Sequence, residues 1–170
     1  MKNNKNAILF IVYFAVAYIL LSVIYQAILV LFEPKADFFT TLVSKTVVLL
    51  FKDSSITELK NTPGYLFSIN HIPVVNIKEG CNGIAVFVTV VSFCIAFKGY
   101  LKTYFWFLPV SFLLIQIANI IRLYILIRIK ISTPLYFDFF HVYVFPAIIY
   151  LMAFVIMVWW VKKYSYATGK

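Results

Sequence analysis

The sequence predicts an all-α integral membrane helical bundle. We expect about four transmembrane helices, an interfacial helix and a small extracytoplasmic β-hairpin. Of the 170 residues, 64% are hydrophobic and only 12% are charged, whereas soluble domains are about 45–50% apolar and about 25% charged. The mean hydropathy of +0.96 agrees with this class. The length leaves room for one membrane domain, residues 1–170, without a second globular domain.

Four apolar segments account for the expected transmembrane helices. The first is uncharged from residue 7 to residue 32, and about 20 such residues are enough to cross a bilayer. The fourth ends in two tryptophans followed by Lys162 and Lys163, a pattern typical of a membrane interface. The four predicted spans are approximately 7–32, 81–101, 104–127 and 142–161.

The segment between the first two spans, residues 33–80, is expected outside the membrane on the extracytoplasmic side. Within it, residues 38–51 are too short to cross, and their periodicity favours an interfacial or re-entrant helix. Its apolar face would carry Phe38, Phe39, Leu42, Val43 and Val47. Two short β-prone runs, 65–69 and 74–77, flank the turn Asn70-His71-Ile72-Pro73. They predict a hairpin that leads the chain to Cys81.

The charge distribution indicates an orientation in the membrane. The formal net charge is +9, but the basic residues flank apolar runs, so lipid head groups explain them better than nucleic acid does. If both termini are cytoplasmic, the inner segments contain cations and no acid. These cations are Lys2, Lys5, Lys98, Lys102, Lys162, Lys163 and Lys170. We therefore expect a multi-pass protein of the cytoplasmic (inner) membrane, with its outer face extracytoplasmic.

This threading brings three reactive side chains to one membrane depth. Cys81 begins the second span at the outer face, and His141 directly precedes the fourth. Arg122 lies about 27 Å along a helix that rises from Tyr104 at the inner face. That distance approaches the hydrocarbon thickness of about 30 Å, so Arg122 also arrives near the outer surface.

The three residue types suit nucleophilic catalysis. The N-terminus of a helix favours the thiolate form of Cys81, and a neighbouring His141 could accept its proton. Arg122 stays protonated, so it would hold an oxyanion or a carboxylate rather than act as a base. Gln116 and Asn119 form a polar stripe with Arg122 that should face the bundle interior.

Each residue also has a structural interpretation. Cys81 could be a small packing residue, and Arg122 an interfacial anchor whose side chain extends toward water. His141 could cap a helix, and Glu79 could be an exposed loop carboxylate. His71 is interpreted as a turn residue or a weaker alternative base. No metal-ligand spacing occurs, so no metal or cofactor is expected.

Taken together, three motifs resemble the exosortase/archaeosortase family, and in particular its short type F variant. They are Glu79-Gly80-Cys81-Asn82-Gly83, Asn119-Ile120-Ile121-Arg122 and His141, and the resemblance covers roughly residues 61–161. It implies a membrane cysteine protease/transpeptidase that cleaves C-terminal sorting signals of exported proteins through a thioacyl intermediate. Cys81 would be the nucleophile, Arg122 would stabilise the oxyanion and His141 would be the acid/base. Glu79, Asn82 and Asn119 would support them.

The resemblance also implies partners. Substrates would be membrane-anchored proteins with a C-terminal sorting signal. Since the chain has fewer spans than full-length relatives, an accessory membrane protein could help to hold them. The family more often has Ser where this chain has Asn82, which changes the local hydrogen bonding. The alternative function is a non-enzymatic membrane assembly subunit that binds a partner helix through Arg122. A small transporter fits less well, because the polar groups lie near one surface.

Overall fold

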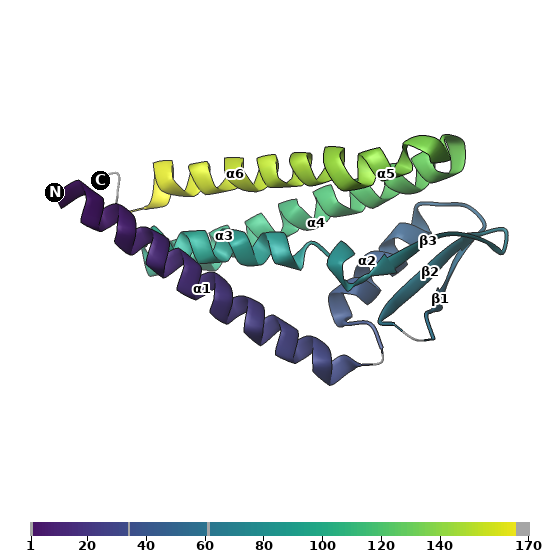
Figure 1. Cartoon of the computed structure of the whole chain (residues 1–170), viewed down its shortest axis with the longest axis horizontal. Helices are drawn as coiled ribbons and strands as arrows, with labels where there is room; N and C mark the ends of the chain where they lie inside the picture. Colours follow the sequence, from purple (N-terminus) through teal and green to yellow (C-terminus); the bar gives the residue numbers. More distant parts are fainter. Residues whose placement is uncertain (1, 34, 61, 166–170) are drawn as a thin grey trace.

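The computed structural model describes residues 2–33, 35–60 and 62–165, with side chains from Lys5 onward. Figure 1 shows the start of the first helix and the end of the last helix at one end of a helical bundle, and a small sheet with one helix at the other. The main elements are α1 (Lys2–Phe32), α2 (Phe38–Leu49), β1 (Ser54–Glu58), β2 (Gly64–Ile69), β3 (Ile72–Lys78), α3 (Ile84–Ala96), α4 (Leu101–Ser132), α5 (Phe137–Phe139) and α6 (Phe145–Tyr164).

Among the described residues, three helical segments are long and apolar enough to cross a membrane, namely Lys5–Phe32, Leu101–Ser132 and Pro134–Tyr164. They confirm a membrane helical bundle in outline. The predicted bounds of the second span, 81–101, are wrong, because α3 has only 13 residues and is about 20 Å long. Gly83 caps its start with φ 75°, and Lys98, with φ 37°, follows its end. The number of crossings therefore stays a prediction.

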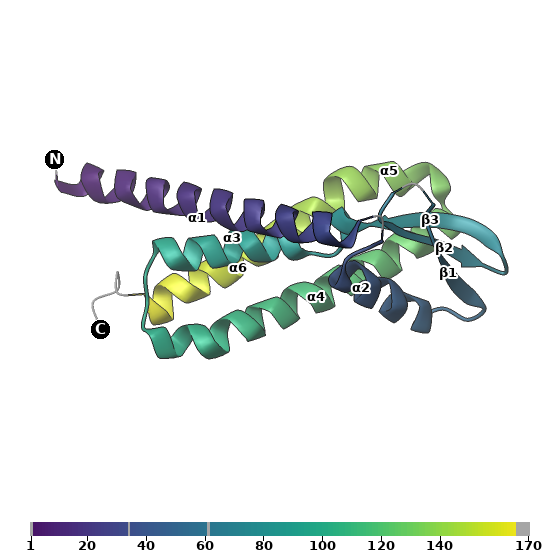
Figure 2. The ribbon, with the colours of Figure 1, turned by 90° about the horizontal axis from the view of Figure 1, so that it is seen from below.

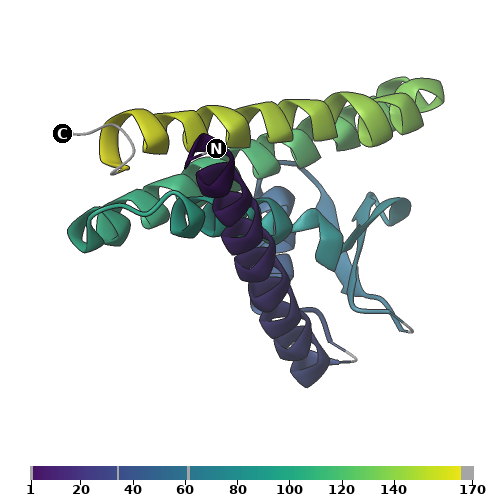
Figure 3. The same cartoon turned by 60° about the vertical axis from the view of Figure 1, so that its left-hand side comes forward.

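Helices α3, α4 and α6 pack side by side around one apolar core (Figure 2). This core contains Phe107 and Trp160, both fully buried, with Val90 and Cys94 of α3. Helix α1 packs on α3 near its N-terminus, where the Phe10 ring lies 4.5 Å from the Phe97 ring. It then runs away from α4 and α6 (Figure 3). Most apolar side chains of α1 are exposed, as expected for a helix that faces lipid.

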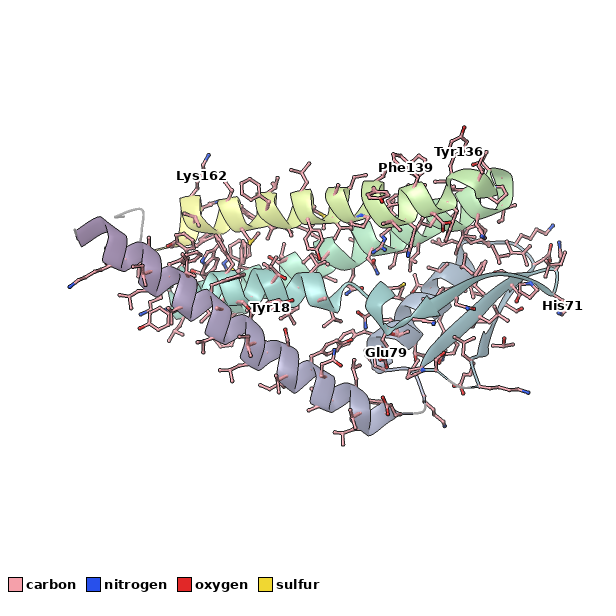
Figure 4. All side chains as sticks on the ribbon, in the orientation of Figure 1. Tyr18, His71, Glu79, Tyr136, Phe139 and Lys162 are labelled. Atoms are coloured by element: carbon pink, nitrogen blue, oxygen red, sulfur yellow. The ribbon has the colours of Figure 1, made fainter. Side chains whose placement is uncertain are left out.

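The cations predicted for the inner side gather at the end of the bundle that holds both termini. Gly99 pairs with Ser165 there, so the α3–α4 turn meets the end of α6. The Lys98 ammonium lies over the Tyr13 ring of α1, 5.0 Å from its centroid. Lys162 extends from the same end (Figure 4). Lys170 and the side chain of Lys2 lie outside the described residues.

The predicted hairpin is confirmed as β2 and β3, but the sheet has a third strand. The antiparallel order is β1-β2-β3. Asn70 and His71 join β2 to β3 and have φ values of 49° and 65°, which is typical of a two-residue type I′ turn. Strand β1 was missed because its sequence, SSITE, has one apolar residue and no alternation.

The segment 38–51 forms a helix that ends at Leu49, and its predicted apolar face is only partly correct, since Val43 and Val47 are buried as expected. Asp37 caps α2, and its Oδ1 accepts a 2.6 Å hydrogen bond from the Thr40 backbone N–H. The buried face contains Thr40, Val43, Ser44 and Val47, whereas Phe38 and Leu42 are exposed. The reason is that α2 packs on the sheet and on α4. Val43 and Val47 form a second apolar core there with Phe67, Ile77, Leu123 and Ile127. An interfacial or re-entrant position of α2 stays a prediction.

The helical segment that contains His141 begins earlier than predicted. It runs from Pro134 to Tyr164, so His141 does not start a span at residue 142 but lies inside the segment. A π-helical turn, Phe140–Val144, surrounds it. Pro146 has no N–H to donate to the carbonyl four residues earlier, which disfavours regular α-helical bonding at this point. Single π turns of this kind are frequent at functional sites.

The β2–β3 turn provides a test of the sheet. His71 lies at the tip of the hairpin, far from Glu79 (Figure 4), which removes it as a base for Cys81. We expect His71→Gly to raise the free energy of unfolding by about 0.5–1 kcal/mol, because glycine adopts positive φ without steric cost. His71→Val should lower it, since a β-branched residue is strained there. Thermal unfolding of the purified protein in detergent measures both, and equal midpoints for the two variants would contradict the turn assignment.

Candidate active site around Cys81

Cys81 lies in the short connection between the sheet and the bundle. It ends a 3₁₀ turn, Glu79–Cys81, that follows β3 directly. The prediction that Cys81 itself opens a helix is wrong, because Asn82 and Gly83 separate it from α3. The Asn82 Oδ1 accepts the first free N–H of that helix, from Ile84, at 3.1 Å. The first N–H of α3 is therefore bonded to Asn82 rather than directed at Cys81.

Two amides of α4 fix the backbone around Cys81. The Asn119 Nδ2 donates to the Cys81 carbonyl at 2.6 Å, and the Gln116 Nε2 donates to the Asn82 carbonyl at 2.9 Å. Asn119 is 1% exposed. The polar stripe predicted on α4 thus faces the interior at these two positions, and its function there is to hold the cysteine segment.

Asn82 joins this segment to α1 and α2. The residue is 2% exposed. Its Nδ2 donates to the Tyr25 hydroxyl at 2.6 Å, to Asp37 Oδ2 at 3.2 Å and to Thr40 Oγ1 at 3.2 Å. The Tyr25 hydroxyl donates in turn to Asp37 Oδ2 at 3.0 Å. We call these four residues the Asn82 network.

Sequence reasoning found only one member of the Asn82 network. It placed Asn82 beside the cysteine but did not identify the three side chains to which its amide donates. Asp37 could have been found, because an aspartate directly before a helical pattern is a common N-cap. Tyr25 carries no such signal, since it is one tyrosine within a long apolar run.

Cys81 and His141 line the same cavity, which has a volume of about 510 Å³. Strand β3, Lys130 and Phe137 form much of its remaining wall. The His141 ring stacks on the Phe137 ring, with centroids 5.5 Å apart and planes 6° apart. The His141 Nδ1 is buried and has no hydrogen-bond partner. The structure thus brings the predicted nucleophile and base to one cavity.

Arg122 lies in an adjacent cavity of about 200 Å³. Gly80, Gly83 and Asn119 also line it, together with residues of α6. Its guanidinium is close enough to His141 for an electrostatic interaction, and its Nε is buried without a hydrogen-bond partner. In the described part of the chain no hydrogen bond joins Arg122 to Cys81. Of the three predicted catalytic residues, Cys81 and His141 therefore share one cavity, whereas Arg122 lines the adjacent one.

Several predicted site residues have buried polar atoms without hydrogen-bond partners. Within residues 5–33, 35–60 and 62–165, four of the seven such atoms belong to predicted site residues: Glu79 Oε1, Asn119 Oδ1, Arg122 Nε and His141 Nδ1. Leaving a buried donor or acceptor unpaired costs about 1–3 kcal/mol. Three of these atoms, on Asn119, Arg122 and His141, belong to residues that line the Cys81 and Arg122 cavities, where a bound ligand would supply the missing partners.

Glu79 faces away from the Cys81 cavity. It lines a separate cavity of about 240 Å³ between α1 and α3, together with Tyr25, and Figure 4 shows it where the sheet meets the bundle. Burial raises the pKa of its carboxyl above the usual 4.5, and the charges of Asp37 and Glu33 raise it further. The Asp37 backbone amide partly opposes this shift.

No family model, no curated protein and no solved structure matches the chain. The described residues contain no group of three His, Cys, Asp or Glu side chains that could hold a metal ion. A function therefore has to be assigned from the chemistry of the side chains around Cys81.

Removing the Asn82 amide should destabilise the protein strongly. We expect Asn82→Ala to lower the free energy of unfolding by about 3 kcal/mol, because the Asp37 carboxylate and two hydroxyls lose a buried donor. The change should also release α1 from α2. Denaturant unfolding in detergent measures the loss, and limited proteolysis after α1 reports the release. Asn76→Ala, at an exposed position of β3, is the control and should change stability by less than about 0.5 kcal/mol. A small effect at Asn82 would contradict the network.

Glu79 should make stability dependent on pH. Its pKa is higher in the folded than in the unfolded protein, so its stabilising contribution exists below the unfolded value and is lost as pH rises through the folded value. At pH 7 the carboxylate is therefore unfavourable. We expect Glu79→Gln to raise the thermal midpoint by roughly 2 °C at pH 7, and the gain should shrink toward pH 4. Melting curves across this range provide the measurement, and a pH-independent difference would refute the assignment.

Proposed function

We propose that this protein is a membrane cysteine protease/transpeptidase of the exosortase type. It would cleave the C-terminal sorting signals of exported proteins and transfer the cleaved proteins to an acceptor. The observation that carries the proposal is the cavity shared by Cys81 and His141, with Arg122 in the adjacent cavity. Neither histidine nor arginine is common in so apolar a chain, and their proximity to a thiol suits acyl transfer.

In the first step the Cys81 Sγ attacks the scissile carbonyl carbon while the thiol proton passes to His141. The carbonyl oxygen becomes an oxyanion, and the Arg122 guanidinium compensates its charge. The C–N bond then breaks, and His141 gives the proton to the leaving amine. A thioester remains on Cys81. An acceptor amine, or water, attacks the thioester and loses a proton through His141, which restores the thiol.

The charges of the chain support an extracytoplasmic position for this reaction. Cys81 lies beyond the end of α3 that is remote from Lys98 and Lys102, and lysines near a short loop favour the cytoplasmic side. Arg122 lies about 30 Å along α4 from Leu101, close to one hydrocarbon thickness. The substrate would be membrane-anchored, and the exposed apolar side chains of α1 would be available to lipid or to an accessory membrane protein.

The unpartnered Arg122 Nε favours a second candidate function. A non-enzymatic assembly subunit could use this arginine to bind an acidic residue of a partner helix, which would supply the missing hydrogen bond. Such a protein would need Arg122 and would tolerate the loss of the Cys81 thiol.

Substitution of Cys81 separates the two functions. In cells, Cys81→Ala should abolish processing of sorting-signal substrates, and wild-type protein should carry an acyl adduct on Cys81 that intact-mass spectrometry detects. Arg122→Lys keeps the charge but loses the donor fork, so processing should slow by about 10²-fold. Abundance of each variant is the control for folding. Normal processing by Cys81→Ala, combined with loss of a co-purifying membrane protein in Arg122→Leu, would establish the assembly function instead.

A further inference from the structure

The outer edge of β3 has no strand beside it. The order β1-β2-β3 makes β3 an edge strand, and within the described residues no hydrogen bond joins residues 72–78 to any element except β2. Such an edge presents free N–H and C=O groups and can pair with another chain. This edge continues into the turn Glu79–Cys81, so it leads directly to the proposed nucleophile.

The register identifies which backbone groups of β3 are free. The Leu59 N–H donates to the Gly64 carbonyl, so Gly64 directs its backbone groups toward β1 rather than β3. Gly64 is opposite Lys78, and Leu66 is opposite Asn76. Because hydrogen-bonded and non-hydrogen-bonded pairs alternate in antiparallel strands, Asn76 and Lys78 both direct their N–H and C=O away from β2.

The Cys81 cavity follows this same edge. Its wall includes residues 73–76 of β3, whose side chains alternate between the two faces of a strand, and Leu66 of β2, which is paired with Asn76. The cavity therefore extends from one face of the sheet over β3 to its free edge. Asn76 and Lys78 line it, whereas Ile77 does not. At the far end, Pro73 lacks an N–H and a bulge interrupts the register between Phe67 and Ser68. These features limit pairing to the part of β3 that is nearest Cys81.

Charge and size favour a peptide as the occupant. Lys78 and Lys130 line the cavity, and within the described residues no carboxylate does, so a segment with acidic side chains complements it. The volume of about 510 Å³ is in the range of ligand sites. Backbone pairing needs little side-chain specificity. A peptide paired with β3 would also have its scissile carbonyl aligned with the end of β3 that is next to Cys81.

We propose that the substrate segment next to the scissile bond binds as an added strand, pairing its backbone with Asn76 and Lys78 on the free edge of β3. The inference rests on the proposed function and deepens it, because it states how the substrate is held. The edge orients the carbonyl toward Cys81, while Arg122 and His141 act on the reacting atoms. Asn76 and Lys78 are thus positioning residues that act through their main-chain groups.

A proline substitution tests the main-chain role. The substrate for this test is the protein whose acyl adduct is identified on wild-type Cys81. Asn76→Pro removes the outward N–H and places a ring at the edge, so processing of this substrate should slow at least tenfold. Asn76→Ala removes the side chain but keeps the outward N–H, so it should slow processing by much less than Asn76→Pro does. Glu58→Pro makes the matched change on the opposite edge of the sheet, in β1, and should stay within twofold of wild type. Abundance and thermal midpoint are measured for each variant, and Lys78→Pro replaces Asn76→Pro if that variant does not fold.

A second arm leaves the enzyme unchanged. Synthetic copies of the trapped segment, each with one N-methylated peptide bond, should lose reactivity at alternate positions, because only every second N–H of an added strand faces β3. Equal rates for Asn76→Pro and Asn76→Ala, or an effect of N-methylation without this alternation, would overturn strand addition. If an acyl adduct on Cys81 is still found in that case, the proposed transpeptidase function would stand and only strand addition would be rejected. Wild-type protein that never carries an adduct would overturn both.

Discussion

The buried Asn82 amide is the interaction on which the arrangement of this protein depends. One side chain donates to Tyr25 of α1 and to Asp37 and Thr40 at the start of α2, while its oxygen caps α3. The Gln116 amide of α4 holds the Asn82 carbonyl. Aromatic contacts also connect these elements, because the Phe112 ring of α4 lies 5.6 Å from the Phe39 ring of α2 and 5.1 Å from the Phe87 ring of α3. The hydrogen bonds of Asn82 add directional restraints in a low-dielectric environment. Cys81 directly precedes Asn82 in the chain, and its own carbonyl accepts from Asn119 of α4, so these contacts also hold the cysteine backbone.

Two apolar cores meet at that junction and have different neighbours. The core of α3, α4 and α6 lies where lipid is expected, and these helices expose many large apolar side chains. The second core, formed by α2, the sheet and the distal half of α4, buries Val47, Phe67 and Ile127 under strands that carry polar residues. Helix α4 belongs to both cores. Because one continuous helix connects them, Asn119 and Arg122 occupy fixed positions where the bundle ends and the sheet begins.

The polar atoms around Cys81 are held without partners in an otherwise apolar setting. A buried guanidinium nitrogen and a buried imidazole nitrogen are costly, and surrounding packing has to maintain them. The stacking of His141 on Phe137 and the π turn around it provide that restraint on one side. The amides of α4 provide it on the other. An arrangement of this kind stabilises a charge that develops in its centre more than one that is already solvated.

The sequence by itself determined the membrane class, the long apolar helices, the hairpin turn and the inward polar stripe of α4. These follow from local composition and periodicity, which the chain carries residue by residue. Strand β1, the buried face of α2, the short α3 and the internal position of His141 depended on what packs against each segment. Only the tertiary structure decided that Tyr25 and Asp37 hold Asn82, and that Arg122 lies in a cavity beside the one shared by Cys81 and His141. Membrane depth can be read along a helix at about 1.5 Å per residue, but the direction in which a side chain points around the bundle depends on contacts between distant segments.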